Sequence, residues 1–181
     1  HHALFQVGSV ITTTGFSTVD FDLWPSFAKW ILVTLMFMGA CAGSTGGGLK
    51  VSRVVIAFKT ASRGIQSLIH PRSIKVLKFE GKTVDQSIIK SLGAYLAGYF
   101  VIFFVSVLIV SLDNMDLETN FTAIAATFNN IGPGLAKAGP TCNFAFFSPL
   151  SKFVMMFDML AGRLELFPML VLFSPRTWRK E

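Results

Sequence analysis

The chain has 181 residues, of which 52% are hydrophobic and 14% are charged, and its mean hydropathy is +0.58. This composition is too apolar for an ordinary soluble domain and indicates an integral membrane protein. The net charge of +6 does not indicate nucleic-acid binding, because eight of the 16 Lys and Arg residues gather in residues 53–90 beside only two acids, which is typical of a cytoplasmic membrane flank.

The N-terminal part of the chain holds two short apolar runs. Residues 5–16, FQVGSVITTTGF, are too few to cross a membrane, and Gly15 stands near their end. Residues 24–38 form the second run, which follows the acidic residues Asp20 and Asp22 and is also short for a span.

A glycine-rich loop comes next, at residues 39–48, with the sequence GACAGSTGGG. Five glycines in ten residues do not hold a regular helix. Because residues 31–49 carry no charge, we expect the loop at membrane depth, where non-helical backbone is buried in protein or lines a cavity. After the loop, the pattern predicts a helical stretch to about residue 59.

Residues 92–112 predict a membrane span, since these 21 residues carry no charge. As a helix they would cover about 31 Å, the thickness of a hydrocarbon core. Lys90 flanks one end and Asp113 the other, so the positive-inside rule predicts that the Lys90 end is cytoplasmic. Residues 144–173 form a longer apolar run that we expect to tilt, bend or leave the bilayer before a basic, cytoplasmic tail.

The segment between these two spans therefore begins and ends on the outer side. Within it, residues 120–135, NFTAIAATFNNIGPGL, hold an apolar stretch too short to cross, which predicts a short helix followed by an extended return. This segment aligns without gaps on residues 5–16, with Gly15 on Gly132. We interpret the chain as two copies of span, pore helix, extended segment and span, the first without its opening span.

The extended segments are the candidate ion site. A dehydrated cation needs oxygens in place of water, and a column of backbone carbonyls supplies them. Carbonyls point the same way only if some residues adopt φ values that glycine tolerates, which suits Gly15 and Gly132, and Pro133 stiffens the turn. Two such segments cannot surround an ion, so we expect two more outside this chain. The competing interpretation is a pair of re-entrant loops with a packing role.

Five motifs in order resemble the C-terminal half of the Trk/Ktr superfamily of potassium uptake proteins: TTTGFSTVDF, GACAGSTGGGLK, IHPRSIKVLK, NNIGPGL and GRLELFPMLVLFSPRTWR. The resemblance covers essentially the whole chain. It implies an all-α integral membrane protein with tandem M1-P-M2 repeats, similar to those of K+ channels, around one pore. Residues 1–63 would be the third repeat without M1, residues 64–90 a basic cytoplasmic linker, and residues 91–181 the fourth repeat with the C-terminal tail.

The resemblance also implies residue roles. The K+ filter would consist of Thr12, Thr13, Thr14, Gly15, Phe16, Asn129, Asn130, Ile131, Gly132 and Pro133, with Thr13, Thr14, Asn129 and Asn130 as K+ ligands. The intramembrane gate would consist of Gly39, Gly43, Ser44, Thr45, Gly46, Gly47, Gly48, Lys50 and Arg163. The loop is not a phosphate-binding loop, since it lacks the Gly-Lys-Ser/Thr order and no strand precedes it.

The roles of Arg163 and Lys50 stay open, and two other residues depart from the family pattern. Arg163 would hydrogen-bond the gate loop or form a positive barrier in the pore, but it could instead pair with Asp158 or Glu165. Lys50 could simply mark the cytoplasmic interface. Ala136 and Lys137 follow GPGL where the family more commonly has a glycine and an acid.

Taken together, the residues and the resemblance predict the pore-forming subunit of a Trk-type K+ uptake system in a bacterial inner membrane, and not an enzyme. K+ would be the transported ion, with no organic cofactor, and the C-terminus would be cytoplasmic. The implied partners are the lipid bilayer, a second copy of the protein, the N-terminal half, and a cytosolic TrkA-like nucleotide-binding subunit, but no nucleic acid. The alternatives are a secondary transporter with re-entrant hairpins for another cation or solute, and a structural subunit without a permeation path.

Overall fold

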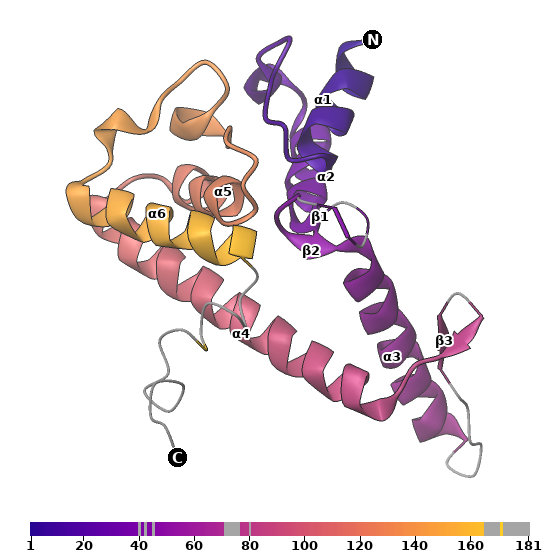
Figure 1. The fold of residues 1–181 in the computed structure, drawn as a ribbon. Coiled ribbons are helices and arrows are strands. Elements are labelled where there is room, and N and C mark those ends of the chain that lie inside the picture. The colour runs from indigo at the N-terminus through magenta and orange to yellow at the C-terminus, as the bar shows by residue number, and fades with distance from the viewer. Residues whose placement is uncertain are drawn as a thin grey trace.

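The computed structural model describes residues 1–39, 41, 43–44, 46–70, 77–79, 81–164 and 171. This part of the chain is predominantly helical, as predicted (Figure 1). Its helices are α1 (His2–Ile11), α2 (Ser26–Phe37), α3 (Val51–Ile69), α4 (Gln86–Val110), α5 (Leu117–Phe128) and α6 (Pro149–Leu164). Short 3-10 helices are η1 (Phe21–Leu23), η2 (Ser111–Asp113), η3 (Ala136–Ala138) and η4 (Phe144–Phe146), and strands are β1 (Met38–Gly39), β2 (Leu49–Lys50), β3 (Lys78–Phe79) and β4 (Lys82–Thr83).

Helix α4 carries the predicted span. Together with η2 it runs through Gln86–Asp113, 28 residues, and it is the one helix in the described ranges that is long and apolar enough to cross a membrane. It begins several residues before the expected residue 92, because the segment between Asp85 and the apolar run also forms helix. Long apolar side chains such as Val101 and Leu108 stay exposed on it, as expected of a surface that faces lipid or further protein.

The glycine loop separates helices α2 and α3. The loop is closed by β1 and β2, which pair in parallel, Met38 with Leu49 and Gly39 with Lys50. Helix α3 then continues well past residue 59 and into the segment 64–90, whose role as a linker stays a prediction. Gly64 is tolerated inside this helix, which ends before Pro71, a residue that disfavours helix in its predecessor. A hairpin of antiparallel β3 and β4 follows, and α4 begins shortly after it.

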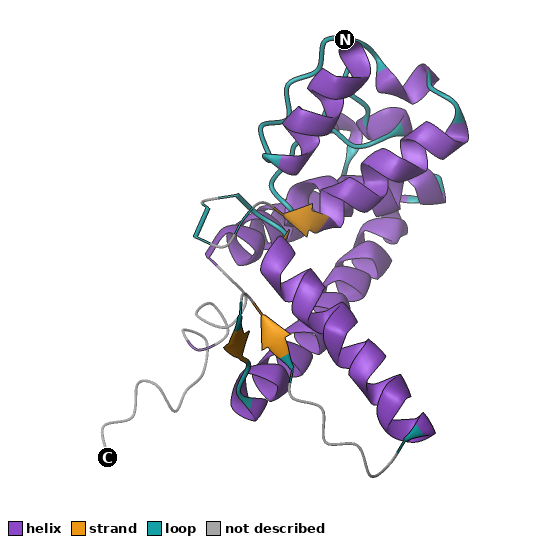
Figure 2. Cartoon of the chain, turned by 90° about the vertical axis from the view of Figure 1, so that its right-hand side faces the viewer, coloured by secondary structure: helices purple, strands orange, loops and turns teal. Residues whose placement is uncertain are grey.

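Figures 1 and 2 show that α3 and the N-terminal half of α4 extend away from the cluster formed by the other helices. Within that cluster, α5 is the central element, with contacts to α2, α4 and α6. Most of its residues are buried, although it is only 12 residues long. Its start is fixed by Asp116, whose side chain accepts a hydrogen bond of 2.9 Å from the Thr119 amide.

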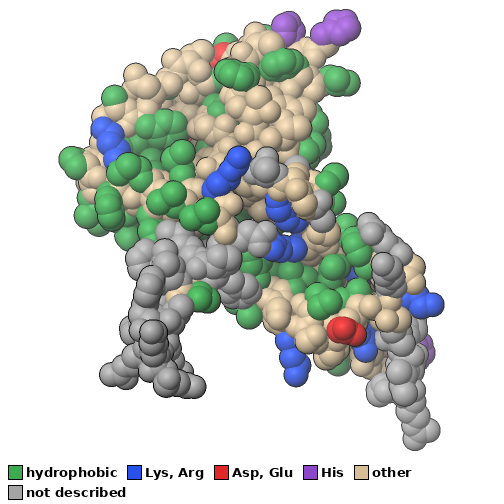
Figure 3. Space-filling view, viewed as in Figure 1, with side chains coloured by type: hydrophobic (Ala, Val, Ile, Leu, Met, Phe, Trp, Pro, Cys, Tyr) green, Lys and Arg blue, Asp and Glu red, His purple; other side chains and the backbone are tan. Residues whose placement is uncertain are grey.

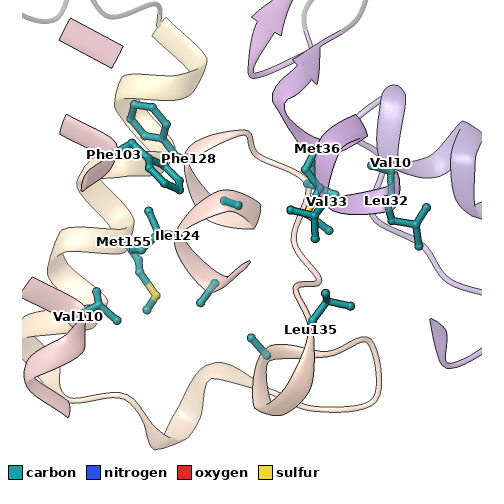
Figure 4. Close-up of a cluster of buried hydrophobic side chains, with 14 of the residues drawn as sticks. Val10, Leu32, Val33, Met36, Phe103, Val110, Ile124, Phe128, Leu135 and Met155 are labelled. Atoms are coloured by element: carbon teal, nitrogen blue, oxygen red, sulfur yellow. The ribbon is translucent and has the colours of Figure 1, made fainter. Parts of the chain in front are cut away.

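Aromatic and aliphatic side chains hold α5 in place. Phe128 packs at 4.7 Å, between ring centroids, from Tyr99 and at 6.3 Å from Phe103 of α4. Figure 4 shows Phe103 beside Phe128, and Leu32, Val33 and Met36 of α2 on the other side of the core. These side chains are almost fully buried, so removing one would cost about 2 to 5 kcal/mol.

A buried polar contact joins α4 to α6. The hydroxyl of Ser106 donates a hydrogen bond of 2.8 Å to Asp158 Oδ1, and both side chains are buried. The alternative in which Asp158 pairs with Arg163 is therefore wrong: Asp158 bonds Ser106, and no ion pair joins these two described residues. Glu165, the other partner considered for Arg163, lies outside the described residues.

Charged groups also join the N-terminal half of the chain to the C-terminal half. Lys29 of α2 forms ion pairs of 3.2 Å with both Asp22 and Glu118. Asp22 Oδ1 also accepts a hydrogen bond of 3.1 Å from the amide of Ala136. Each contact is partly exposed and contributes little by itself, but together they fix the relative position of the two halves at one end of the helical cluster.

Candidate functional site

Two short helices, α1 and α5, end in the same backbone turn. In each helix, four backbone N–H groups donate hydrogen bonds to carbonyl oxygens at equivalent positions. At the end of α1 these are Thr12 to Gly8 (3.1 Å), Thr13 to Val10 (3.1 Å), Thr14 to Ser9 (2.9 Å) and Gly15 to Ser9 (3.4 Å). At the end of α5 they are Asn129 to Ala125 (3.2 Å), Asn130 to Thr127 (3.1 Å), Ile131 to Ala126 (2.8 Å) and Gly132 to Ala126 (3.4 Å). The predicted alignment of the two segments thus corresponds to equal backbone geometry over these residues.

The dihedral angles agree with the hydrogen bonds. Thr13 and Asn130 both adopt left-handed backbone conformations, with φ of +56° and +57°. Gly15 and Gly132 follow at φ of +79° and +108°. A threonine in the left-handed region costs about 1 to 2 kcal/mol, so surrounding contacts must hold it there. In each turn, residues with positive φ therefore alternate with residues of ordinary φ. This alternation directs the carbonyl groups differently from those of a helix or a regular strand.

The two turns lie against each other. A Cβ atom added to Gly15 would overlap the carbonyl oxygen of Ile131 and come within 3.2 Å of Pro133 Cδ. Two reasons therefore require glycine at position 15: its positive φ and the close approach of the neighbouring backbone. A Cβ atom added to Gly132 would meet no described atom within 4 Å, so only its φ requires glycine in this part of the protein.

The second turn is fixed from both sides. The hydroxyl of Tyr99 on α4 donates a hydrogen bond of 2.6 Å to Asn129 Oδ1, and the side-chain Nδ2 of Asn129 donates one of 2.8 Å to the Ala125 carbonyl. On the α6 side, Asn130 Nδ2 donates to the Met159 carbonyl at 3.0 Å. Gly162 is packed so closely on the Phe128 carbonyl that a side chain there would overlap it.

The first turn is fixed mainly by its own side chains. The Thr12 hydroxyl bonds the Gly8 carbonyl at 2.7 Å and the Thr14 hydroxyl at 2.8 Å. Ser9 donates a hydrogen bond of 2.6 Å to the Phe16 carbonyl, which draws the chain back along α1. The Phe16 side chain itself is 72% exposed. The hydroxyl groups of Ser9, Thr12 and Thr14 are thus occupied by internal hydrogen bonds.

The glycine loop lies directly against the second turn. A Cβ atom at Gly47 would overlap the Asn129 carbonyl, and one at Gly48 would stand 2.9 Å from Asn129 Oδ1. A Cβ atom at Gly39 would stand 2.5 Å from the Gly47 carbonyl oxygen, within the loop itself. The chain thus brings the predicted filter and the predicted gate together at Asn129.

Lys50 ties the loop to the start of α3. Its ammonium group donates hydrogen bonds to the carbonyl of Ser44 and, at 3.1 Å, to the carbonyl of Gly46. It also lies 3.4 Å from the Ser44 hydroxyl. Gly43, at φ of +85°, meets no described atom within 4 Å. Thr45, a further predicted gate residue, lies outside the described residues.

Arg163 stands in the last turn of α6, one position after Gly162. Its side chain is exposed, and it forms no hydrogen bond or ion pair with the residues that the structure describes. Its predicted contact with the gate loop is not among the contacts of this structure, and its role as a gate or barrier stays a prediction.

Sequence reasoning missed Tyr99 and Gly162 as supports of the second turn. Tyr99 carried a signal, because a hydroxyl inside a predicted span needs a partner. Gly162 carried none, because the packing of a helical glycine against a distant carbonyl cannot be read from local sequence. Among the described residues, no group of three or more His, Cys, Asp and Glu side chains could hold a metal ion.

Comparisons with known proteins match the chain to one family of membrane transporters. A family model described as TrkH, cation transport protein, matches residues 1–180. The Trk system potassium uptake protein TrkH of Salmonella typhimurium is 39% identical over 180 residues, which are 99% of this chain and 37% of the relative. The TrkH of Halomonas elongata is 37% identical over 179 residues, again 99% and 37%. The crystal structure of the potassium transporter TrkH from Vibrio parahaemolyticus matches with a TM-score of 0.88 at 38% identity, over 98% of this chain and 38% of that one.

The family model that matches nearly the whole chain is described as a cation transport protein, and the helical fold with its membrane-length α4 fits this class. The chain belongs to the TrkH family, which confirms the resemblance to the Trk/Ktr superfamily. It spans about 37% of the length of the curated relatives that it matches.

Proposed function

We propose that this chain forms half of the ion pathway of a potassium uptake protein. The relatives are named as potassium uptake proteins, and their fold matches this one closely. The observation that carries the proposal is the pair of equal turns, Thr12–Gly15 and Asn129–Gly132, lying side by side with the glycine loop against one of them. A dehydrated K+ ion needs carbonyl oxygens, which the two turns would supply, and the glycine loop beside them would act as a movable obstruction.

In this proposal α5 is a pore helix, with α4 as M1 and α6 as M2 of the fourth repeat. Helix α1 is the pore helix of the third repeat, and α2, the glycine loop and α3 together form its broken M2. Gly15 contacts Ile131 of the next turn, so Gly132 would contact the corresponding turn of the following repeat in the rest of the protein. Four turns arranged in this way would surround one axis.

Backbone oxygens are the K+ ligands in this proposal, and side chains hold the backbone. Asn129 supports this division, because its amide oxygen is engaged by Tyr99 and its amide nitrogen by Ala125. Asn130 is likewise engaged by Met159. Thr13, Thr14, Asn129 and Asn130 would therefore contribute carbonyl oxygens. The unlike residues of the two turns imply a less selective filter than four identical strands.

The glycine loop is the proposed gate. Loops rich in glycine have low local stability, so they move at small cost. Here the closed position is held by Lys50, which bonds two loop carbonyls, and by the contact of Gly47 with Asn129. Arg163 would act from the α6 side, next to the Gly162 contact.

The same proposal sets the orientation. The Lys90 end of α4 and the basic segment between α3 and α4 lie in the cytoplasm of a bacterium, and α4 crosses the inner membrane. The C-terminal tail is cytoplasmic as well. A homodimer and a cytosolic TrkA-like nucleotide-binding subunit would complete the system, and the ion would move with or without a coupled H+ or Na+.

The deciding experiment is 86Rb+ uptake by cells that lack their own K+ uptake systems and express the full reading frame. Gly132→Ser is compared with Gly93→Ser, at equal membrane expression and with Na+ as competitor. Gly93 is a matched control, because it sits in α4 at an ordinary helical φ with no described atom within 4 Å of its Cβ position. Uptake or ion preference lost only in Gly132→Ser supports the proposal, whereas unchanged uptake in both variants contradicts it.

A further inference from the structure

A hollow lined by cationic side chains lies between the end of α3 and the β3–β4 hairpin. Its volume is about 330 Å³, and its lining comprises Phe58, Lys59, Ser62, Arg63, Gln66, Leu77 and Lys78. Three of these seven side chains are cationic and none is acidic. Such a composition favours an anionic ligand.

Internal contacts shape this hollow. Lys59 Nζ donates a hydrogen bond of 3.0 Å to the Lys78 carbonyl and lies 5.9 Å from the centre of the Phe79 ring. Leu77 is buried beneath them, at 5% exposure. The hairpin is therefore held against α3, and the charged group of Lys59 is held at the edge of the hollow.

The cations of the hollow are not neutralised by the described part of the protein. The ion pairs found among the described residues both involve Lys29, far from this place in the chain. Helix α3 itself contains Arg53, Lys59 and Arg63 and no Asp or Glu. Figure 3 shows Lys and Arg side chains on the part of the surface formed by α3 and the hairpin, together with acidic side-chain surface nearby. Among the described residues that line the hollow itself, a ligand with negative charge would meet cations and no acid.

The position of the hollow along the membrane normal follows from α4. The hairpin ends at Thr83, and the uncharged part of α4 begins at residue 92, so the hairpin stands about 10 Å before the hydrocarbon boundary. Polar headgroups occupy about 5 to 8 Å on each side of the hydrocarbon core. With the proposed orientation, on which this inference rests, the hollow lies at the outer, aqueous edge of the headgroup layer of the cytoplasmic leaflet.

Exposed apolar side chains lie along α3, and one of them, Phe58, lines the hollow. Phe58 is 71% exposed and Ile65 60%, and at the helix end Leu68 and Ile69 are 83% and 65% exposed. Helix α3 has no buried residue. A ligand that carries a phosphate and acyl chains would satisfy both the cations and this apolar surface, which a free phosphate ion would not.

We propose that the hollow formed by Lys59, Arg63 and Lys78 binds the phosphate group of an anionic phospholipid of the cytoplasmic leaflet. The headgroup phosphate would lie among the three cations, and the acyl chains would follow the exposed apolar side chains of α3. Because α3 leads directly from Lys50 and the glycine loop, a lipid bound there would hold the lower half of this broken helix at a fixed depth.

The test uses the purified full-length protein, without any regulatory subunit, and measures retained phosphatidylglycerol by native mass spectrometry. Phosphatidylethanolamine serves as the zwitterionic comparison. Arg63→Gln removes a cation that forms no hydrogen bond or ion pair with the described residues, and Lys59→Gln/Arg63→Gln removes two. Lys90→Gln is the matched control, since it removes one exposed cation on the same side of the membrane but outside the hollow.

We expect phosphatidylglycerol affinity to fall several-fold in Arg63→Gln and on the order of tenfold or more in the double variant, with no change in Lys90→Gln. Equal retention in the wild type and the double variant would overturn the proposal. So would full displacement of the lipid by millimolar inorganic phosphate, which would identify a site for soluble anions. Lipid retention is measured without any ion flux. The result can therefore be interpreted even if the transport proposal fails.

Discussion

Tyr99 and Asn129 form the hydrogen bond that links the membrane-length helix to the candidate filter. The Tyr99 hydroxyl donates to Asn129 Oδ1 at 2.6 Å, and both side chains are almost fully buried. The same Asn129 residue touches the glycine loop through its carbonyl and its side chain. Helix, turn and loop thus meet at a single residue.

Tyr99→Phe should remove this bond and leave a buried amide oxygen without its donor. The expected cost is about 1 to 3 kcal/mol in the free energy of unfolding, together with a weaker preference for K+ over Na+. Thermal unfolding in detergent and 86Rb+ uptake with Na+ competition measure the two effects. A double-mutant cycle with Asn129→Ala isolates the pair, and a coupling energy near zero would show that the hydrogen bond contributes nothing.

Lys50→Met should release the glycine loop. The substitution keeps most of the side-chain length but removes the donor to the Ser44 and Gly46 carbonyls. Hydrogen bonds from a charged group contribute about 1.5 to 3 kcal/mol, so the basal rate of 86Rb+ flux should rise about tenfold if the loop is the gate. Lys90→Met, near the start of α4, is the control for the loss of one exposed cation. Reduced or unchanged flux in Lys50→Met would mean that the loop does not obstruct the ion.

Gly162→Ala should destabilise the protein, although alanine favours helix. A Cβ atom at this position would overlap the Phe128 carbonyl and approach Asn130 Nδ2 at 3.0 Å, so α6 and the second turn must separate. We expect a loss of about 1 to 3 kcal/mol, seen as a lower midpoint of thermal unfolding. Gly64→Ala in α3 is the matched substitution, since it meets no described atom within 4 Å and should be neutral or stabilising. Equal midpoints for the two variants would refute the close packing of α6.

Ala136→Gly should stabilise the protein. Ala136 adopts φ of +52°, a left-handed conformation that glycine accepts at lower cost, and its amide bonds Asp22. Relief of strain exceeds the entropy cost of an added glycine, which leaves a net gain of about 0.5 to 1 kcal/mol. The midpoint of thermal unfolding measures this gain. Ala138→Gly, at the end of the same 3-10 helix, should instead destabilise, because Ala138 does not have a positive φ.

Acid should weaken the start of α5. Burial raises the pKa of Asp116, but hydrogen bonds from the Thr119 amide and hydroxyl outweigh it, and the folded-state pKa is lowered from 3.8. A lowered pKa means that the stabilisation is present above the unfolded value and is lost as the pH falls through the folded value. Unfolding midpoints measured from pH 6 down to pH 3 should therefore fall less steeply in Asp116→Asn than in the wild type. Parallel slopes would show that the cap carries no such contribution.

Much of this architecture could be predicted from the sequence, because the bilayer makes composition informative. An uncharged run of membrane length predicted α4, and a glycine cluster predicted a helix break. The ungapped alignment of Gly15 with Gly132 predicted equal turns, because positive φ is a local requirement that glycine meets and most residues resist. Element boundaries were less predictable: α3 runs past residue 59 because nothing local ends it before Pro71.

The tertiary structure alone decided which groups meet at the candidate site. That Gly47 packs on Asn129, that Gly162 packs on Phe128, and that Tyr99 reaches Asn129 all depend on how α4, α5, α6 and the loop are packed in three dimensions. Residues such as Tyr99 and Asn129 are far apart in the sequence, and no periodicity or composition records their contact. Local sequence determined the conformations that each segment can adopt, whereas close packing among buried helices selected the pairs that touch, because only one arrangement satisfies their shapes and hydrogen bonds together.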